Sequence, residues 1–342
     1  MLGALCTTHP VKKVKSEEND EDIGPRVSDD QRFSSREVFK PQPWSISVGY
    51  RYQPSSRHFV GTVEQKQRES INNQIQNIYH LYDVGIERQL TKRFSATASI
   101  PVLFAYRNQL YNPIAEYRVR GIGDMTIGGR GWIFRPPTEN GGNIAIGVSL
   151  KLPTGKADAT GLARDSRTGA TVLAVADQSI QAGDKGVGFA IDTQGYKPLY
   201  YGIMGYFSGS YLFNPRDTNG VRTFRTRPLE AVMSVSDQYL ARAGFARAVP
   251  KVRGLVVTLG ARIEGVPVRD LIGKSNGFRR PGYAISGDPG FLYARWGYVF
   301  SVGVPWAIER NRRASVPDIT VGAHGDAAFA DYTVTMGVSR RF

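Results

Sequence analysis

The stretch YTVTMGVSRRF, residues 332–342, alternates apolar side chains with small or polar ones up to an aromatic last residue. A period of two places the apolar members on one face of a β-strand, namely Tyr332, Val334, Met336 and Val338. Bacterial outer-membrane barrels commonly end in such a strand, whose terminal aromatic residue is recognised by the insertion machinery. The pattern therefore predicts a final membrane-crossing strand, with that machinery as a partner through Phe342. Arg340 departs from the pattern, but near a membrane interface an arginine can extend its charged end into water.

The same alternation occurs at eleven other places along the chain. Each place has one apolar face and one face of small or polar residues, as where Ile144, Ile146 and Val148 alternate with Ala145 and Gly147. With the last strand, the sequence predicts twelve strands. The other eleven are 44–52, 82–87, 94–104, 125–130, 144–152, 187–196, 200–213, 232–248, 255–265, 288–295 and 298–308.

The connections between these strands alternate in length. The long ones are predicted at 54–77, 107–120, 154–186, 214–227, 266–287 and 311–327, with short turns between the others. Outer-membrane barrels have short periplasmic turns and long outer loops, whereas a soluble sandwich has no reason to alternate them. The predicted fold is thus an all-β, antiparallel transmembrane β-barrel of the bacterial outer membrane, with about 12 strands. A helical membrane protein is excluded, because no apolar stretch approaches the roughly 18 to 20 residues that a membrane helix needs.

Charge divides the chain at residue 43. Residues 1–43 hold seven Lys and Arg against eight Asp and Glu, without apolar periodicity, and are predicted to be a flexible periplasmic tail before a barrel at 44–342. The apolar start at Met1 is too short for a signal peptide, so a longer leader is expected. The barrel region holds 37 basic against 22 acidic residues. Because its arginines are dispersed along strands, nucleic acid is not expected, and lipopolysaccharide phosphates or an anionic solute are the expected partners.

Four segments together resemble the outer-membrane family known as "MetA-pathway of phenol degradation". They are Gly121-Ile-Gly-Asp-Met-Thr-Ile-Gly-Gly129, Lys151-Leu-Pro-Thr-Gly155, Asp177-Gln-Ser-Ile-Gln-Ala-Gly183 and Phe213-Asn-Pro-Arg-Asp-Thr-Asn-Gly220. The resemblance spans roughly residues 44–342, and its motifs are turn and loop signatures that carry little chemistry. It implies a pore or carrier for aromatic or other small organic compounds.

Ten charged residues fall on the predicted lumen-facing side of the strands. They are Arg51, Asp83, Glu87, Arg107, Asp124, Arg130, Lys151, Arg242, Arg262 and Glu264. Charges inside a barrel must be paired or hydrated. Two interpretations stay open: a ladder of ion pairs that braces the wall, or an arginine-rich constriction that favours anionic solutes.

Two long loops are also candidates for function. In loop 154–186 the segment Ala170–Ala176 either folds inward as a plug or forms an exposed flap. Loop 266–287 is either an outer rim that meets lipopolysaccharide phosphates or a merely solvated loop. Its charged residues are Arg269, Asp270, Lys274, Arg279 and Arg280.

An esterase is a further candidate, because one twelve-stranded outer-membrane class, phospholipase A, is an esterase. Such a site needs Ser and His within hydrogen-bond reach. His80 falls on the lipid-facing side of its strand without a nucleophile motif near it, which favours an interfacial histidine. His9, His58 and His324 lack metal-ligand spacing. No enzyme activity, metal or cofactor is predicted.

Three functions are therefore weighed. The first is an outer-membrane channel or facilitator for small solutes, aromatic or anionic organic compounds among them. The second is a plugged barrel with a structural or surface-interaction role, and the third is the lipid esterase.

Overall fold

The computed structural model describes residues 43–342 except 110–113, 135–140, 166 and 226. The predicted tail therefore lies outside the described residues, apart from Pro43, and stays a prediction. The first strand begins at Trp44, at the change in sequence texture.

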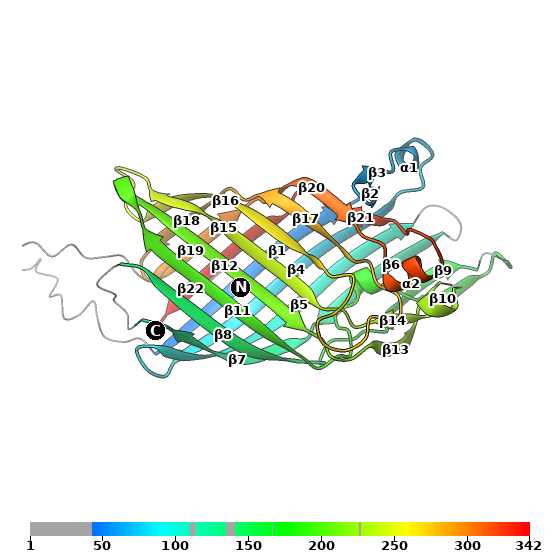
Figure 1. The fold of residues 1–342 in the computed structure, drawn as a ribbon, viewed down its shortest axis with the longest axis horizontal. Coiled ribbons are helices and arrows are strands. Elements are labelled where there is room, and N and C mark those ends of the chain that lie inside the picture. The colour runs from blue at the N-terminus through cyan, green and yellow to red at the C-terminus, as the bar shows by residue number, and fades with distance from the viewer. Residues whose placement is uncertain (1–42, 110–113, 135–140, 166, 226) are drawn as a thin grey trace, which may run out of the picture.

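Twelve antiparallel strands form one closed barrel, which confirms the predicted fold class. Figure 1 shows the strands inclined to the long axis of the molecule. Nine are continuous: β1 (Trp44–Ser55), β4 (Ile75–Gln89), β5 (Phe94–Gln109), β8 (Asn143–Leu152), β11 (Gly188–Pro198), β12 (Ile203–Phe213), β15 (Gln238–Ala248), β16 (Leu255–Val266) and β22 (Val334–Arg341). Three are interrupted: β6 (Ala115–Ile122) with β7 (Met125–Trp132), β17 (Gly282–Gly287) with β18 (Gly290–Arg295), and β19 (Tyr298–Gly303) with β20 (Trp306–Arg312).

The first and last strands close the barrel. β22 pairs with β1 from Ser45 opposite Arg341 to Tyr52 opposite Val334, and Phe342 N donates to Trp44 O at 2.9 Å. We call the end of the barrel at which Phe342 lies the turn end. The opposite end, which has the longer connections, is called the loop end (Figure 1).

The wall has an apolar outside and a polar inside over most of its height. In β8 the side chains of Ile146, Val148 and Leu150 are exposed on the outside, whereas Ser149 and Lys151 are buried inside. This arrangement inverts the rule for soluble barrels and fits a wall whose outside faces lipid. Among the described residues, no helix is both long and apolar enough to cross a membrane.

A β-bulge changes the face of one strand near the loop end. Opposite β17, Ile285 pairs with Glu309 and Ser286 with Ala307, so Ile308 is the extra residue. Ile308 and Glu309 are both exposed, and the following Arg310 is buried. The bulge therefore directs the arginines of β20 inward.

The loop end carries several small elements. A three-stranded sheet combines β2 (Arg57–Val60), β3 (Val63–Glu64) and β21 (Ala327–Phe329), with helix α1 (Gln67–Ser70) after β3. The hairpin of β9 (Thr160–Arg164) and β10 (Thr171–Val175) continues the wall by pairing with β6. β13 (Thr218–Arg222), β14 (Val232–Ser234), η3 (Gln178–Ile180), η5 (Pro228–Glu230) and α2 (Val316–Thr320) complete this end, and η4 (Tyr200–Gly202) lies in a turn at the other.

Several predicted boundaries are wrong at the loop end. The connection expected at 107–120 is short, because β5 continues to Gln109 and β6 begins at Ala115. In β6 the residues Ala115, Tyr117 and Val119 are buried inside, while the charged residues between them are exposed outside. The faces expected for a lipid-facing strand are reversed here, because charged side chains instead of apolar ones cover the outside of this part of the wall. Likewise, β4 begins at Ile75 rather than 82, and the tenth strand begins with β17 at Gly282 rather than at 288.

Candidate functional site

A cross-lumen ion-pair group connects β1 with β16 inside the barrel. Arg51 on β1 donates to Glu264 on β16 at 2.8 Å, and Arg262 donates to the other oxygen of Glu264 at 2.6 Å. On the shorter way around the wall, three strands lie between β16 and β1. The Arg51 to Glu264 contact therefore crosses the lumen instead of running along the wall.

Two further predicted arginines pair with carboxylates that the sequence analysis did not select. Arg130 on β7 donates to Asp192 on β11 at 3.0 Å, over the intervening β8. Arg242 on β15 lies 2.9 Å from Asp288, which follows β17. Asp192 could have been found, because it falls on the inward side of β11 with the buried Ala190. Asp288 lies in a strand interruption, where alternation gives no face.

Asp124 and Lys151 lie where three motifs of the family resemblance meet. Lys151 Nζ is 2.5 Å from Asp184 and 3.7 Å from Asp124. The Asp124 carboxylate accepts the backbone N–H of Gly155 at 2.9 Å and that of Asp184 at 3.2 Å. A Cβ on Gly155 would lie 2.7 Å from the Cα of Gly183, so these two glycines allow the segments to touch. This junction joins loop 154–186 to the wall.

The last predicted cation, Arg107, belongs to a buried group around Asp177. Arg280 binds both oxygens of Asp177 at 2.6 Å, and Arg107 lies 3.5 Å from the same carboxylate while donating to Asn77 at 2.9 Å. Burial alone raises the pKa of Asp177, but the charges of Arg107 and Arg280 outweigh it and hold the pKa well below its usual range.

The inward part of loop 154–186 differs from the predicted plug. β10, which covers most of Ala170–Ala176, lies in the wall hairpin with Leu173 exposed. The inward segment starts with Ala176 and includes the fully buried Ile180, which packs against the inner side of β6. Tyr79 on β4 donates to Ser179 O and ties the segment to the wall. Neither the plug nor the flap interpretation is therefore right for Ala170–Ala176 as a whole.

Part of the predicted rim also points inward. Arg279 is 1 % exposed, where it binds both oxygens of Asp270 and the hydroxyl of Ser234, and Arg280 reaches Asp177. These residues are not available to lipopolysaccharide, which corrects the rim prediction for them. Arg269 and Lys274 are exposed, and their contact with lipopolysaccharide stays a prediction.

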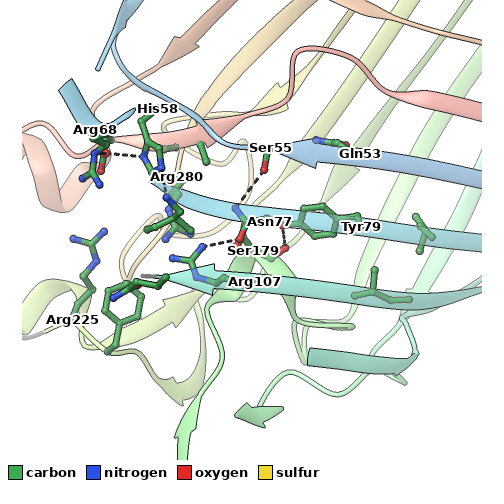
Figure 2. A pocket seen from close by; sticks show the side chains of 18 of the residues that line it. Gln53, Ser55, His58, Arg68, Asn77, Tyr79, Arg107, Ser179, Arg225 and Arg280 are labelled. Atoms are coloured by element: carbon green, nitrogen blue, oxygen red, sulfur yellow. Dashed lines mark hydrogen bonds and ion pairs between the residues drawn. The ribbon is translucent and has the colours of Figure 1, made fainter. Parts of the chain in front are cut away.

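A cavity of about 480 Å³ opens inside the loop end. Figure 2 shows Arg225, Arg280 and Arg107 around it, with Arg68 and His58 above and Ser55, Asn77 and Tyr79 along the strands. Leu81, Leu103 and Ile75 add apolar surface. We call this space the outer cavity. Of its residues, Arg51, Arg107 and Arg280 were selected from the sequence, whereas Arg68 and Arg225 in the loops and uncharged strand residues such as Asn77 and Tyr79 were missed.

Two smaller cavities lie in the half of the lumen near the turn end. One of about 140 Å³ is lined by Ser45, Ser47 and Ser99 and by the predicted residues Asp83, Glu87 and Arg130. The other, of about 280 Å³, has mostly apolar walls, including Met204, Tyr206 and Leu292, with Arg242 at its edge. The structure thus places all ten predicted charged residues inside the barrel wall or at its strand interruptions, and their role in a solute path stays a prediction.

His80 and His58, which were considered for catalysis and for metal binding, both have structural contacts. His80 Nδ1 lies 2.9 Å from the hydroxyl of Tyr50, and its ring lies against Tyr50 and Tyr52. His58 Nε2 accepts the N–H of Ile75, so His58 Nδ1 carries the hydrogen that faces Asp326 at 2.9 Å. Within the described ranges, no group of three or more His, Cys, Asp or Glu is placed to hold a metal ion.

Acid should weaken the anchor of α1 and β21 through Asp326. Burial raises the pKa of Asp326, but the hydrogen bond from His58 and the charge of Arg68 lower it from about 3.8 to about 2. A lowered pKa stabilises the fold above about pH 4, by about 2 kcal/mol, and this stabilisation is lost as pH falls through about 2. We expect Asp326→Asn to flatten the pH dependence of unfolding between about pH 4 and 2, measured by denaturant titration in detergent. Parallel profiles for the two proteins would contradict the assignment.

Comparison with known proteins supports the fold. No family model matches the chain, and no curated protein matches it either. The solved structure of the COG4313 outer membrane channel from Pseudomonas putida F1 is similar over 88% of this chain and 96% of that one, with 11% identity and a TM-score of 0.59. The β domain of the Bordetella autotransporter BrkA has 14% identity over 88% and 98% of the two chains, with a TM-score of 0.46. The P. putida toluene transporter TodX has 10% identity over 89% and 91%, with a TM-score of 0.43. The chain has the fold of bacterial outer-membrane β-barrels.

Proposed function

We propose that the protein is an outer-membrane channel for small organic solutes, aromatic or anionic compounds among them. The observation that carries the proposal is a closed barrel with an apolar outside and a charged inside that is hollowed toward both ends. The outer cavity lies at the loop end, and the two smaller cavities lie toward the turn end. Fixed charges and polar groups along an interior of this kind select among solutes in pores.

In this proposal, the ion-pair group of Arg51, Glu264 and Arg262 is the constriction between the cavities. Charges in this position stay paired or hydrated, because an unpaired buried charge is costly. A charged solute that pairs with these side chains as it passes would replace their ion pairs. Neither the carboxylate nor the guanidinium groups would then be left without a partner. The same group combines the two interpretations drawn from the sequence, since one set of residues both braces the wall and sets selectivity.

The orientation and partners follow from the same proposal. The loop end faces outward, where the exposed Arg269 and Lys274 meet lipopolysaccharide phosphates, and the turn end faces the periplasm. The strand that ends at Phe342 is the one recognised during insertion. An aromatic solute is supported by the resemblance of the motifs at 121–129 and 151–155 to the phenol-degradation family.

Flux through the reconstituted protein tests the channel. We expect discrete conductance in planar bilayers and entry of benzoate into liposomes that contain the protein. Benzoate is an aromatic carboxylate that crosses lipid at neutral pH only through its small protonated fraction, and liposomes without protein measure this background. Absence of both conductance and flux would contradict the channel.

A plugged barrel is the second candidate. The observation in its favour is the inward segment at 176–186, which packs against β6 and contacts Arg107 and Arg280 inside the loop end. The flux experiment separates the two candidates, because a plugged barrel would insert and stay folded without passing ions or benzoate.

A further inference from the structure

The outer cavity has more cations than its carboxylates neutralise. Among the described residues, its lining includes five arginines, Arg51, Arg68, Arg107, Arg225 and Arg280, but only one carboxylate, Asp326. Two more carboxylates act from behind the lining: Glu264 pairs with Arg51, and Asp177 is shared by Arg107 and Arg280. Arg68 pairs with Asp326 at 2.8 Å. The five arginines thus face three carboxylates, and Arg225 is the one that none of these three carboxylates pairs with.

Arg225 forms no ion pair with any carboxylate among the described residues. Its guanidinium lies 4.7 Å from the ring centre of Phe278 and 5.1 Å from that of Phe224, and its Nε is buried without a hydrogen-bond partner. Glu230 is close enough to act on its pKa but not to pair with it. Burial and the charge of Arg280 lower the pKa of Arg225, as expected for a cation that lacks a counter-ion.

The position of Arg225 leaves its charge directed at the cavity. The two rings hold the side chain in place, and Figure 2 shows it beside Arg280 at the edge of the outer cavity. Arg280 also stacks on Phe278, at 4.7 Å, and its own charge is already used by Asp177. A planar guanidinium that is fixed and unpaired is suited to bind a carboxylate through two parallel hydrogen bonds.

The rest of the outer cavity suits an apolar group. Leu81, Leu103 and Ile75 line it together with Phe224, and hydrogen-bonding side chains such as Asn77 and Gln109 also line it. A volume of about 480 Å³ is in the range of pockets that hold small organic ligands. An inorganic anion would use the arginine but none of this apolar surface.

We propose that the outer cavity binds a small organic carboxylate, whose charged group pairs with Arg225 and whose apolar body packs against Phe224 and the neighbouring apolar lining. This inference rests on the proposed channel, and it gives the solute a chemical class. Binding at the loop end would concentrate the carboxylate above the constriction, where the charge of Arg51 is next on the path.

Calorimetric titration of the whole detergent-solubilised protein with benzoate tests the site. We expect saturable binding that Arg225→Gln weakens roughly 10- to 100-fold, the effect of losing a charge-assisted hydrogen-bond pair. Arg225→Lys should recover only part of the affinity, because it keeps the charge but not the planar fork. Benzyl alcohol, which has the ring without the carboxylate, should bind no more tightly to the parent protein than to Arg225→Gln.

Arg118→Gln is the matched control, because Arg118 lies at the same end of the barrel, is exposed and, among the described residues, has Glu116 as its only carboxylate partner. Electrophoretic mobility before and after heating shows that each variant is folded. Benzoate affinity that is equal in the parent and Arg225→Gln proteins would overturn the site, and so would tighter binding of inorganic phosphate than of benzoate. Benzoate binding without flux would support the site and contradict the channel alone, whereas flux without Arg225-dependent binding would overturn the site alone.

Discussion

Asp177→Ala should destabilise the barrel by about 3–5 kcal/mol, because it leaves the buried Arg107 and the partly buried Arg280 without their shared carboxylate. The side chain of Asp177 is 1% exposed, and that of Arg107 is 3% exposed. Neither Arg107 nor Arg280 has another carboxylate partner among the described residues. The inward segment should then detach, since it pairs with Arg107 of β5 through Asp177. Its η3 turn should also loosen, since Asp177 accepts the N–H of Ser179 at 2.9 Å.

Denaturant unfolding in detergent, followed by tryptophan fluorescence, measures this loss. Asp158→Ala is the control from the same loop, because Asp158 pairs with Lys185 where both side chains are largely exposed, at 44% and 40%. An exposed pair of this kind contributes about 0–1 kcal/mol. Equal midpoints for Asp177→Ala and Asp158→Ala would refute a structural role for the buried group.

Glu264→Gln should shift the channel toward anions. The substitution keeps the volume of the side chain but removes the charge that Arg51 and Arg262 share. Two guanidinium groups would then face the lumen without a counter-charge, and the field at the proposed constriction would repel cations. Loss of the contact between β1 and β16 should also raise the conductance.

The reversal potential across a salt gradient in planar bilayers measures the shift, and single-channel current measures the conductance. Glu116→Gln removes a carboxylate from the exposed outside of β6, where it pairs with Arg118, and should leave both quantities unchanged. A reversal potential that is the same in Glu264→Gln and the parent protein would show that the constriction lies elsewhere.

The sequence was sufficient to predict which side chains face lipid in the membrane-facing part of the wall. It was insufficient to predict the arrangement of the loop end. A period of two in β8 and β22 is set by lipid on one side and a polar lumen on the other, so the residues alone give the face. Above that zone the constraint is absent: in β6 the apolar residues Tyr117 and Val119 turn inward because the inward segment packs on them. Local alternation cannot show which distant segment supplies such a surface.

The charged site was predictable to the same extent. Alternation gave Arg51, Arg242 and Glu264, because each lies on the inward side of a regular strand. It could not give Asp177 or Arg225, since neither lies on a regular strand and their positions depend on tertiary contacts. The arginines were thus easier to find than most of the carboxylates that pair with them.

The contact between Arg51 and Glu264 also bears on the order of assembly. The two residues are 213 positions apart in the chain, and the wall on their shorter side includes the seam between β1 and β22. Contacts of such high sequence separation form late, because a long loop of chain must first be closed. Until β1 pairs with β22, we expect both side chains to lie in an open, hydrated sheet. The ion pair between Arg51 and Glu264 should therefore form only when the barrel closes.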